Sequence, residues 1–258
     1  MPVGLMRRPT ADHEEFSMRL SIPIPARTAT LGLAAVLATA LLPASAAVAA
    51  TGAAGSAVRY APVALASAHG TQWASSSPWG GYVATGSGFR SIVGSWVEPA
   101  VTCNSRNNLF APWVGIDGYG SQTVEQTGAQ VSCSTGRPVY SAWYEMYPAS
   151  PVYLSGTVAA GDSFTGSVTT TGNGSYKIVL TDNTQGWTYS TTKRLNAENV
   201  SAEAIIESPT QSYPTFSSMN FSGITVNGSV FSSYNPLSLA SGQYVPTALN
   251  GGSFSMVP

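Results

Sequence analysis

Histidine is almost absent from this chain of 258 residues, which contains only His13 and His69. His13 precedes a segment typical of an export signal, and His69 lies in a low-complexity stretch that we interpret as a propeptide. Histidine is the usual general base of secreted hydrolases. If both segments are removed, a Ser-His-Asp triad is excluded, and any enzymatic proton transfer has to depend on carboxyl groups.

Charged residues and long apolar runs are also scarce. Only 9% of the residues are charged and the formal net charge is -1, so the composition indicates neither a nucleic acid nor an anionic membrane surface as partner. The apolar run at 31–42 is too short to span a bilayer. With basic residues before it and small residues after it, this run predicts a signal peptide over 1–50, with Met18 as an alternative start. We therefore expect a secreted, extracellular protein without a membrane segment.

The sequence has only two cysteines, Cys103 and Cys133. In an exported chain, a single pair is most simply explained by one disulfide. Closing a loop of about 30 residues would stabilise the fold by about 3 kcal/mol in the chain-entropy description. Two free, buried thiols are the alternative. A cysteine nucleophile is not expected, because the mature chain has no histidine to activate it.

The rest of the chain predicts a leader followed by one β domain. Residues 51–75 are rich in Ala, Gly and Ser and are interpreted as a leader or propeptide. Short β-branched and aromatic runs, separated by turn residues, follow at 91–97, 140–147, 163–170, 176–181 and 223–226. Residues 197–207 fit a helix or a strand, and their surroundings favour a strand. We predict an all-β domain over 76–258, an antiparallel β-sandwich of two large sheets of the concanavalin-like or jelly-roll type.

Alternation along the expected strands predicts which side chains share a face. Four sets are grouped in this way: Glu203, Ile205 and Glu207; Gln126, Val124 and Gly128, with Glu125 pointing away; Trp143, Glu145 and Tyr147; and Trp113 with Asp117. Acids and amides therefore alternate with aromatic residues and glycine on one face. Unpaired polar groups are costly in a core, so we expect this face to form the open wall of a cleft that holds an extended polymer.

Several familiar catalytic arrangements lack their residues here. A zinc site would have no histidine and one cysteine pair, and no Asp is followed by the Thr/Ser-Gly turn of an aspartic dyad. The most convincing acids that remain are Glu145, Glu203 and Glu207. Two glutamates across a cleft suit glycoside hydrolysis, whereas one glutamate with an amide partner suits the attack of water on a peptide carbonyl. A sandwich that binds a carbohydrate or peptide without catalysis is a third alternative.

Five motifs in the chain are weak individually and specific in combination. They are Trp79-Gly80-Gly81, Trp113-Val114-Gly115-Ile116-Asp117-Gly118, Gln126-Thr127-Gly128, Ala142-Trp143-Tyr144-Glu145-Met146-Tyr147-Pro148 and Ala202-Glu203-Ala204-Ile205-Ile206-Glu207. In this order and at this spacing, they closely resemble the motifs of the glutamic peptidases, also called eqolisins, which are best known as acid endopeptidases of filamentous fungi. The resemblance extends from about Trp79 to Phe221.

The resemblance implies a sandwich with a substrate groove on one concave face. It places the catalytic glutamine of the family at Gln126 and the catalytic glutamate at Glu207 rather than Glu203. By similarity, Glu207 is the general base toward water and then the acid toward the leaving amine, while Gln126 positions the water and stabilises the tetrahedral intermediate. Groove-lining or supporting positions fall on Trp79, Trp113, Asp117, Trp143, Glu145, Tyr147 and Glu203.

The chain also departs from the fungal pattern at three positions. Gln130 stands where fungal members often carry Asp, Glu125 where they often carry Leu, and Met146 where they carry an aromatic residue. These departures affect subsite preference and pH profile rather than the catalytic pair. The resemblance as a whole implies a secreted endopeptidase without a cofactor or metal, expected to be a monomer that acts on protein or peptide substrates at acid pH.

Overall fold

The computed structural model describes residues 60–61 and 78–258. The expected signal peptide at 1–50 and all of the expected leader except Tyr60 and Ala61 lie outside the described residues, as do both histidines. The described part consists of strands and one short 3-10 helix, η1 (Phe231–Tyr234). Within these residues, no helix has the length and hydropathy that a membrane span requires.

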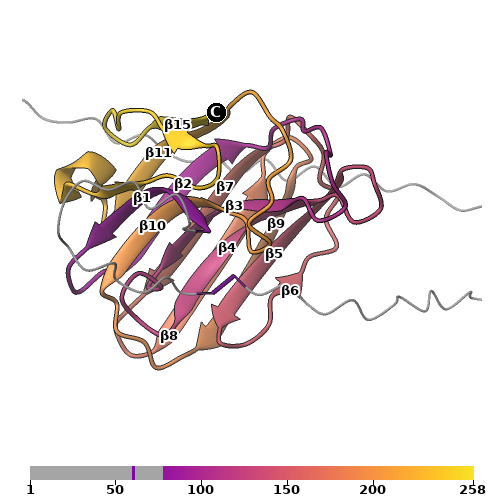
Figure 1. Ribbon diagram of the computed structural model, residues 1–258. Helices are drawn as coiled ribbons and strands as arrows, with labels where there is room; N and C mark the ends of the chain where they lie inside the picture. The colour runs from indigo at the N-terminus through magenta and orange to yellow at the C-terminus, as the bar shows by residue number, and fades with distance from the viewer. Residues whose placement is uncertain (1–59, 62–77) are drawn as a thin grey trace, which may run out of the picture. The chain divides into compact units, whose positions relative to one another are not determined.

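Two antiparallel sheets form a β-sandwich, as the sequence predicts (Figure 1). The first sheet has seven strands in the order β13-β1-β10-β3-β4-β5-β6. Its strands are β1 (Trp79–Thr85), β3 (Leu109–Ile116), β4 (Val124–Ser132), β5 (Val139–Tyr147), β6 (Val152–Tyr153), β10 (Ser201–Glu207) and β13 (Leu237–Leu239). In the eight-stranded second sheet, β12 pairs with β11 beside the path β14-β15-β11-β2-β7-β8-β9. Its strands are β2 (Ser91–Val97), β7 (Ser163–Thr170), β8 (Ser175–Asp182), β9 (Trp187–Arg194), β11 (Met219–Val226), β12 (Ser229–Val230), β14 (Val245–Pro246) and β15 (Phe254–Val257).

The segment at 197–207, which the sequence leaves open between helix and strand, contains strand β10. This strand pairs with β1 on one side and β3 on the other, and all seven of its residues are buried. A central strand covered on both faces favours β-branched side chains, which Ile205 and Ile206 supply. Because β10 ends at Glu207, it places that carboxyl beside the ends of two neighbouring strands.

The main hydrophobic core lies between the two sheets, on what we call the inner face of the first sheet. Val114 of β3 points into this core and faces two glycines of the second sheet. A Cβ atom at Gly94 would lie 2.9 Å from Cγ1 of Val114, and one at Gly166 would lie 3.0 Å from Cγ2. Glycine at these two positions therefore lets the sheets approach each other closely. The opposite side of the first sheet is its outer face.

Cys103 and Cys133 form a disulfide, with their Cα atoms 5.7 Å apart. This confirms the predicted crosslink, and the alternative of two free thiols is wrong. The bond joins the segment after β2 to the residue that follows β4, and it encloses the chain that carries β3 and β4.

Candidate active site

Gln126 and Glu207 project from the same side of the first sheet. Gln126 of β4 pairs across the sheet with Gly115 of β3 and with Glu145 of β5. Gly115 also pairs with Glu203 of β10, which lies on the same face of that strand as Glu207. Directly paired residues of neighbouring strands point to the same side. The alternation predicted for these strands is therefore confirmed, and it assembles the polar residues on the outer face.

The side-chain amide of Gln126 is held by a carboxylate and donates to a backbone carbonyl. Its Nε2 donates to Oε2 of Glu145 at 2.8 Å and to the backbone oxygen of Tyr60 at 3.0 Å. Its Oε1 has no hydrogen-bond partner among the described residues, although it is buried. Glu145 thus fixes which end of the amide points toward the carbonyl, and Oε1 remains able to accept a hydrogen bond from a water molecule.

Glu207 is buried among tryptophans at the end of β10. Its Oε2 accepts a hydrogen bond of 3.2 Å from Nε1 of Trp113, whose ring meets that of Trp79 edge-on at 4.7 Å between centroids. Burial raises the pKa of Glu207 well above its ordinary value, and the carboxyl of Glu145 raises it further. The indoles of Trp113 and Trp79 act in the opposite direction. A carboxyl tuned by these opposing effects is typical of a proton-transfer group.

Glu203 shares the outer face with Glu207 but has different neighbours. Burial raises its pKa well above the ordinary value, and the carboxyls of Asp117 and Glu125 raise it further. By contrast, Glu207 interacts with Glu145, the carboxylate that binds the glutamine amide. Glu207 therefore differs from Glu203 in that its pKa responds to the same carboxyl that binds the glutamine amide.

Asp117 does not share a strand face with Trp113, in contrast to the prediction. Strand β3 ends at Ile116, and Asp117 adopts a left-handed conformation with a φ of 66°. Its carboxylate accepts backbone N–H bonds from Asn199 and Val200, each 2.8 Å long. Asp117 thereby holds the segment that leads into β10, which is a supporting position rather than a place on the outer face.

The outer face is buried, in contrast to the open cleft wall that the sequence predicts. Gln126 and Glu145 have no exposed area, and Glu207 is 1% exposed. A second hydrophobic cluster surrounds them, consisting of Tyr60, Trp79, Val83, Ala111, Trp113, Tyr119, Val124, Trp143 and Ile205, with Tyr147 packed against it. Buried polar groups are tolerated when they are hydrogen-bonded. Nε2 of Gln126 and Oε2 of Glu207 are hydrogen-bonded, whereas Oε1 of Gln126 has no partner among the described residues.

The sequence analysis misses Tyr60 and Tyr153 at the site, and it names Gln130 only as a departure from the fungal pattern that affects subsite preference. The ring of Tyr60 stacks on Trp143, and its hydroxyl donates to Oε1 of Gln130, which also accepts a bond from Tyr153. Figure 1 shows the segment 60–61 passing in front of the first sheet. Alternation from Gln126 would have found Gln130, four residues later on the same strand. A single tyrosine in an Ala-, Gly- and Ser-rich stretch gives no comparable signal.

Glu125 and Glu98 are buried as well, without a hydrogen bond to Gln126 or Glu207 among the described residues. Glu125 pairs with Ile116 and Met146, whose side chains belong to the core between the sheets. Burial raises the pKa of Glu125 to about 9, with a further contribution from the carboxyl of Asp117. Burial likewise raises the pKa of Glu98, just after β2, to about 8. Both side chains are therefore neutral at acid pH.

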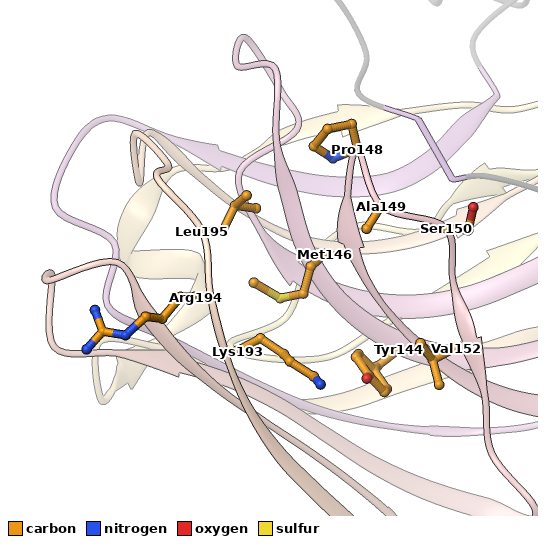
Figure 2. Close-up of a pocket in the computed structure, with 9 residues that line it drawn as sticks. All are labelled: Tyr144, Met146, Pro148, Ala149, Ser150, Val152, Lys193, Arg194 and Leu195. Carbon is orange, nitrogen blue, oxygen red and sulfur yellow. The ribbon is translucent and has the colours of Figure 1, made fainter.

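A cavity of about 470 Å³ lies on the other side of β5 (Figure 2). It is lined by Tyr144, Met146, Pro148, Ala149, Ser150, Val152, Lys193, Arg194 and Leu195. None of these residues is an acid, and Tyr144 and Met146 alternate with Glu145 along the strand. This cavity is therefore separate from the polar cluster. Across residues 60–61 and 78–258, no group of three or more His, Cys, Asp or Glu side chains is placed to hold a metal ion.

Comparisons with known proteins identify the family and agree with the fold. The sequence model of the peptidase A4 family matches residues 77–246 of this chain. Scytalido-glutamic peptidase with a transition state analog inhibitor is 26% identical, with a TM-score of 0.62 over 70% of this chain and 98% of that one. SCP-B, an eqolisin in complex with the tripeptide Ala-Ile-His, has the same identity and coverage and a TM-score of 0.58. Aspergilloglutamic peptidase from Aspergillus niger is 26% identical, with a TM-score of 0.50 over 58% of this chain and 98% of that one. Among curated protein sequences, no match is found.

Proposed function

The chain belongs to the peptidase A4 family and is a glutamic-type peptidase, and we propose that it is a secreted endopeptidase that cleaves unfolded protein at acid pH. One observation carries this proposal. The amide of Gln126 donates to a backbone carbonyl at 3.0 Å, on the same face that holds the buried carboxyl of Glu207. Hydrolysis of a peptide bond requires a hydrogen-bond donor at the attacked carbonyl together with a base for the water.

The proposed reaction uses Glu207 as base and then as acid. Ionised Glu207 takes a proton from water, whose oxygen forms a bond to the carbonyl carbon of the substrate. The negative charge that develops on the carbonyl oxygen is stabilised by the N–H of Gln126, which Glu145 holds in place. The carbon–nitrogen bond then breaks, and Glu207 returns the proton to the leaving amine.

The pH range follows from the ionisation of Glu207. This residue acts as a base only when it is ionised, so activity rises with pH as the carboxyl loses its proton. Because the site raises its pKa, we expect this rise above the ordinary glutamate value of about 4.3. No histidine occurs in residues 76–258 to support catalysis at neutral pH. We therefore place the optimum between the ordinary glutamate pKa and neutrality.

The proposal is tested by measuring the digestion of denatured casein between about pH 3 and 7, a range that includes the ordinary glutamate pKa. Removing an oxyanion donor typically costs ~100- to 1,000-fold in turnover, so Gln126→Ala should lose at least that much. Glu207→Gln should lose more, whereas Glu203→Gln should retain more. Glu198→Gln, at an exposed position, controls for the loss of one negative charge and should match the unaltered protein.

Two results would contradict the proposal. One is casein cleavage that survives Glu207→Gln. The other is strong inhibition by a metal chelator or by pepstatin, which mimics the transition state of an aspartic dyad. If the casein stays intact and a polysaccharide is hydrolysed, the glycoside hydrolase alternative is correct. If neither is cleaved and peptide binding survives Glu207→Gln, the protein is a binding module.

A further inference from the structure

Tyr60 is held through its backbone by Gln126, which the proposed mechanism places at the substrate, and by Glu145, which holds Gln126. Its N–H donates to Oε2 of Glu145 at 3.3 Å, and its carbonyl accepts from Nε2 of Gln126 at 3.0 Å. Tyr60 is fully buried, whereas the next residue, Ala61, is exposed. Both backbone polar groups of Tyr60 are therefore hydrogen-bonded by the site. Its carbonyl accepts a hydrogen bond from Gln126, the proposed oxyanion donor.

The side chain of Tyr60 occupies a site whose polar groups match a phenol. Its ring stacks on Trp143, with centroids 4.1 Å apart and planes inclined by 10°. Its hydroxyl donates to Oε1 of Gln130, and the hydroxyl of Tyr153 donates to the same oxygen at 3.2 Å. A phenylalanine ring would keep the stacking but would remove one donor from a buried acceptor. Sites that bond a substrate hydroxyl discriminate against analogues that lack it.

We propose that Trp143, Gln130 and Tyr153 form the subsite for the residue that supplies the scissile carbonyl, that this subsite selects tyrosine, and that Tyr60 is its resident occupant. This inference rests on the proposed function, because the role of Gln126 as oxyanion donor is what identifies the Tyr60 carbonyl as the attacked one. The bond presented for cleavage is then Tyr60–Ala61.

Cleavage of this bond balances as an ordinary hydrolysis. The water oxygen bonds to the carbonyl carbon of Tyr60, and Glu207 takes the released proton. The bond from that carbon to the nitrogen of Ala61 breaks, and the nitrogen receives the proton from Glu207. The products are a carboxylic acid at Tyr60 and a free amine at Ala61.

Matched peptides test the selectivity of the subsite. Three peptides that differ only in the residue before the scissile Ala, which is Tyr, Phe or Leu, are compared by kcat/KM. We expect Tyr to exceed Phe by about 10-fold, the effect of one hydrogen bond to a buried acceptor, and Phe to exceed Leu through stacking on Trp143. Gln130→Leu should bring the ratio of Tyr to Phe close to one. Gln122→Leu, at an exposed position before β4, is the matched control and should leave the ratio unchanged.

The outcomes separate this inference from the proposed function. If neither the peptides nor denatured casein are cleaved, the proposed function fails. If casein is cleaved but the cuts do not follow tyrosine, the subsite is wrong and the peptidase stands. Equal cleavage after Tyr and Phe, or a preference for Tyr that survives Gln130→Leu, would also overturn the subsite.

Mass spectrometry of the full chain tests whether Tyr60 occupies the subsite as a substrate. After acid incubation, the active protein should yield a fragment that begins at Ala61, and Glu207→Gln should not. Tyr60→Gly should slow cleavage at this bond without abolishing cleavage of the Tyr-Ala peptide. A protein that cleaves the Tyr-Ala peptide while its own Tyr60–Ala61 bond stays intact would show that Tyr60 is not presented as a substrate.

Discussion

At the scale of single residues, Trp113 lowers the pKa of Glu207, which burial and the carboxyl of Glu145 raise. Its indole N–H donates to Oε2 of that carboxyl at 3.2 Å, and a hydrogen bond to the charged form lowers a pKa. Trp113→Phe keeps most of the ring and removes the donor. The pKa of Glu207 should therefore rise, and the acid limb of kcat/KM should move to higher pH by up to about one unit.

The measurement is a pH profile of kcat/KM on one peptide substrate. Trp187→Phe, on β9 of the second sheet, is a suitable control, because it also removes an indole N–H, here bonded at 2.9 Å to the backbone oxygen of Thr157 in the connection between β6 and β7. This control should leave the limb in place. If Trp113→Phe lowers activity equally at every pH, the indole acts through packing and not through the ionisation of Glu207.

Glu145 should act on Glu207 in the opposite direction. Its negative charge raises the pKa of Glu207, whereas Trp113 lowers it. Glu145→Gln removes the charge, so the acid limb should move to lower pH. Turnover should fall as well, because the replacement binds the amide of Gln126 less strongly than a carboxylate does. A shift to higher pH would show that the interaction between Glu145 and Glu207 has been misassigned.

At the scale of elements, β3 needs a glycine beside Gln126. A Cβ atom at Gly115 would lie 3.0 Å from Cβ of Gln126 and 3.0 Å from Cζ3 of Trp113. Gly115→Ala should therefore displace β4 or the indole and lower kcat at least 10-fold, at a stability cost of about 1–3 kcal/mol. Gly94→Ala is the control, because it crowds β3 from the inner face, at Val114. It should destabilise the protein with a smaller effect on kcat.

The disulfide belongs to the same scale, because it connects the segment before β3 to the end of β4. The two cysteines are 30 residues apart in sequence, and closing a loop of that size is worth about 3 kcal/mol in the chain-entropy description. The double variant Cys103→Ser/Cys133→Ser should lose about that much free energy of unfolding in urea. Thiol titration of the denatured, unreduced protein should find no free thiol, and two reactive thiols would contradict the bond.

Alternation along strands explains what could be predicted from the sequence. It placed Gln126, Glu145 and Glu207 on one face correctly, because each lies inside a continuous strand. It failed at Asp117, because β3 ends at Ile116. Asp117 has a left-handed backbone conformation, and side chains alternate between the two faces only along an extended strand. Burial of the outer face and the position of Tyr60 were not predictable, since both depend on contacts between segments far apart in sequence.

At the scale of the whole molecule, four buried glutamates link folding to pH. Burial raises the pKa of Glu98 to about 8 and that of Glu125 to about 9, and it raises those of Glu203 and Glu207 well above the ordinary value. In the unfolded chain, these groups lose their protons near pH 4.3. Between that pH and their folded pKa values, the folded protein keeps protons that the unfolded chain has lost. Stability is therefore complete below about pH 4 and decreases as the pH rises.

Glu98 and Glu125, whose pKa values are raised to about 8 and about 9, should each contribute a loss of about 1.4 kcal/mol per pH unit between about pH 5 and 8. Urea unfolding at a series of pH values measures the slope. Glu125→Gln keeps the shape of the side chain and removes its ionisation, so the slope should become shallower by about that amount. Glu198→Gln, at an exposed position, should leave the slope unchanged. A free energy of unfolding that increases from pH 4 to pH 7 would show that these carboxyls are ionised in the folded protein, and the fold would then not favour the acid conditions proposed for its reaction.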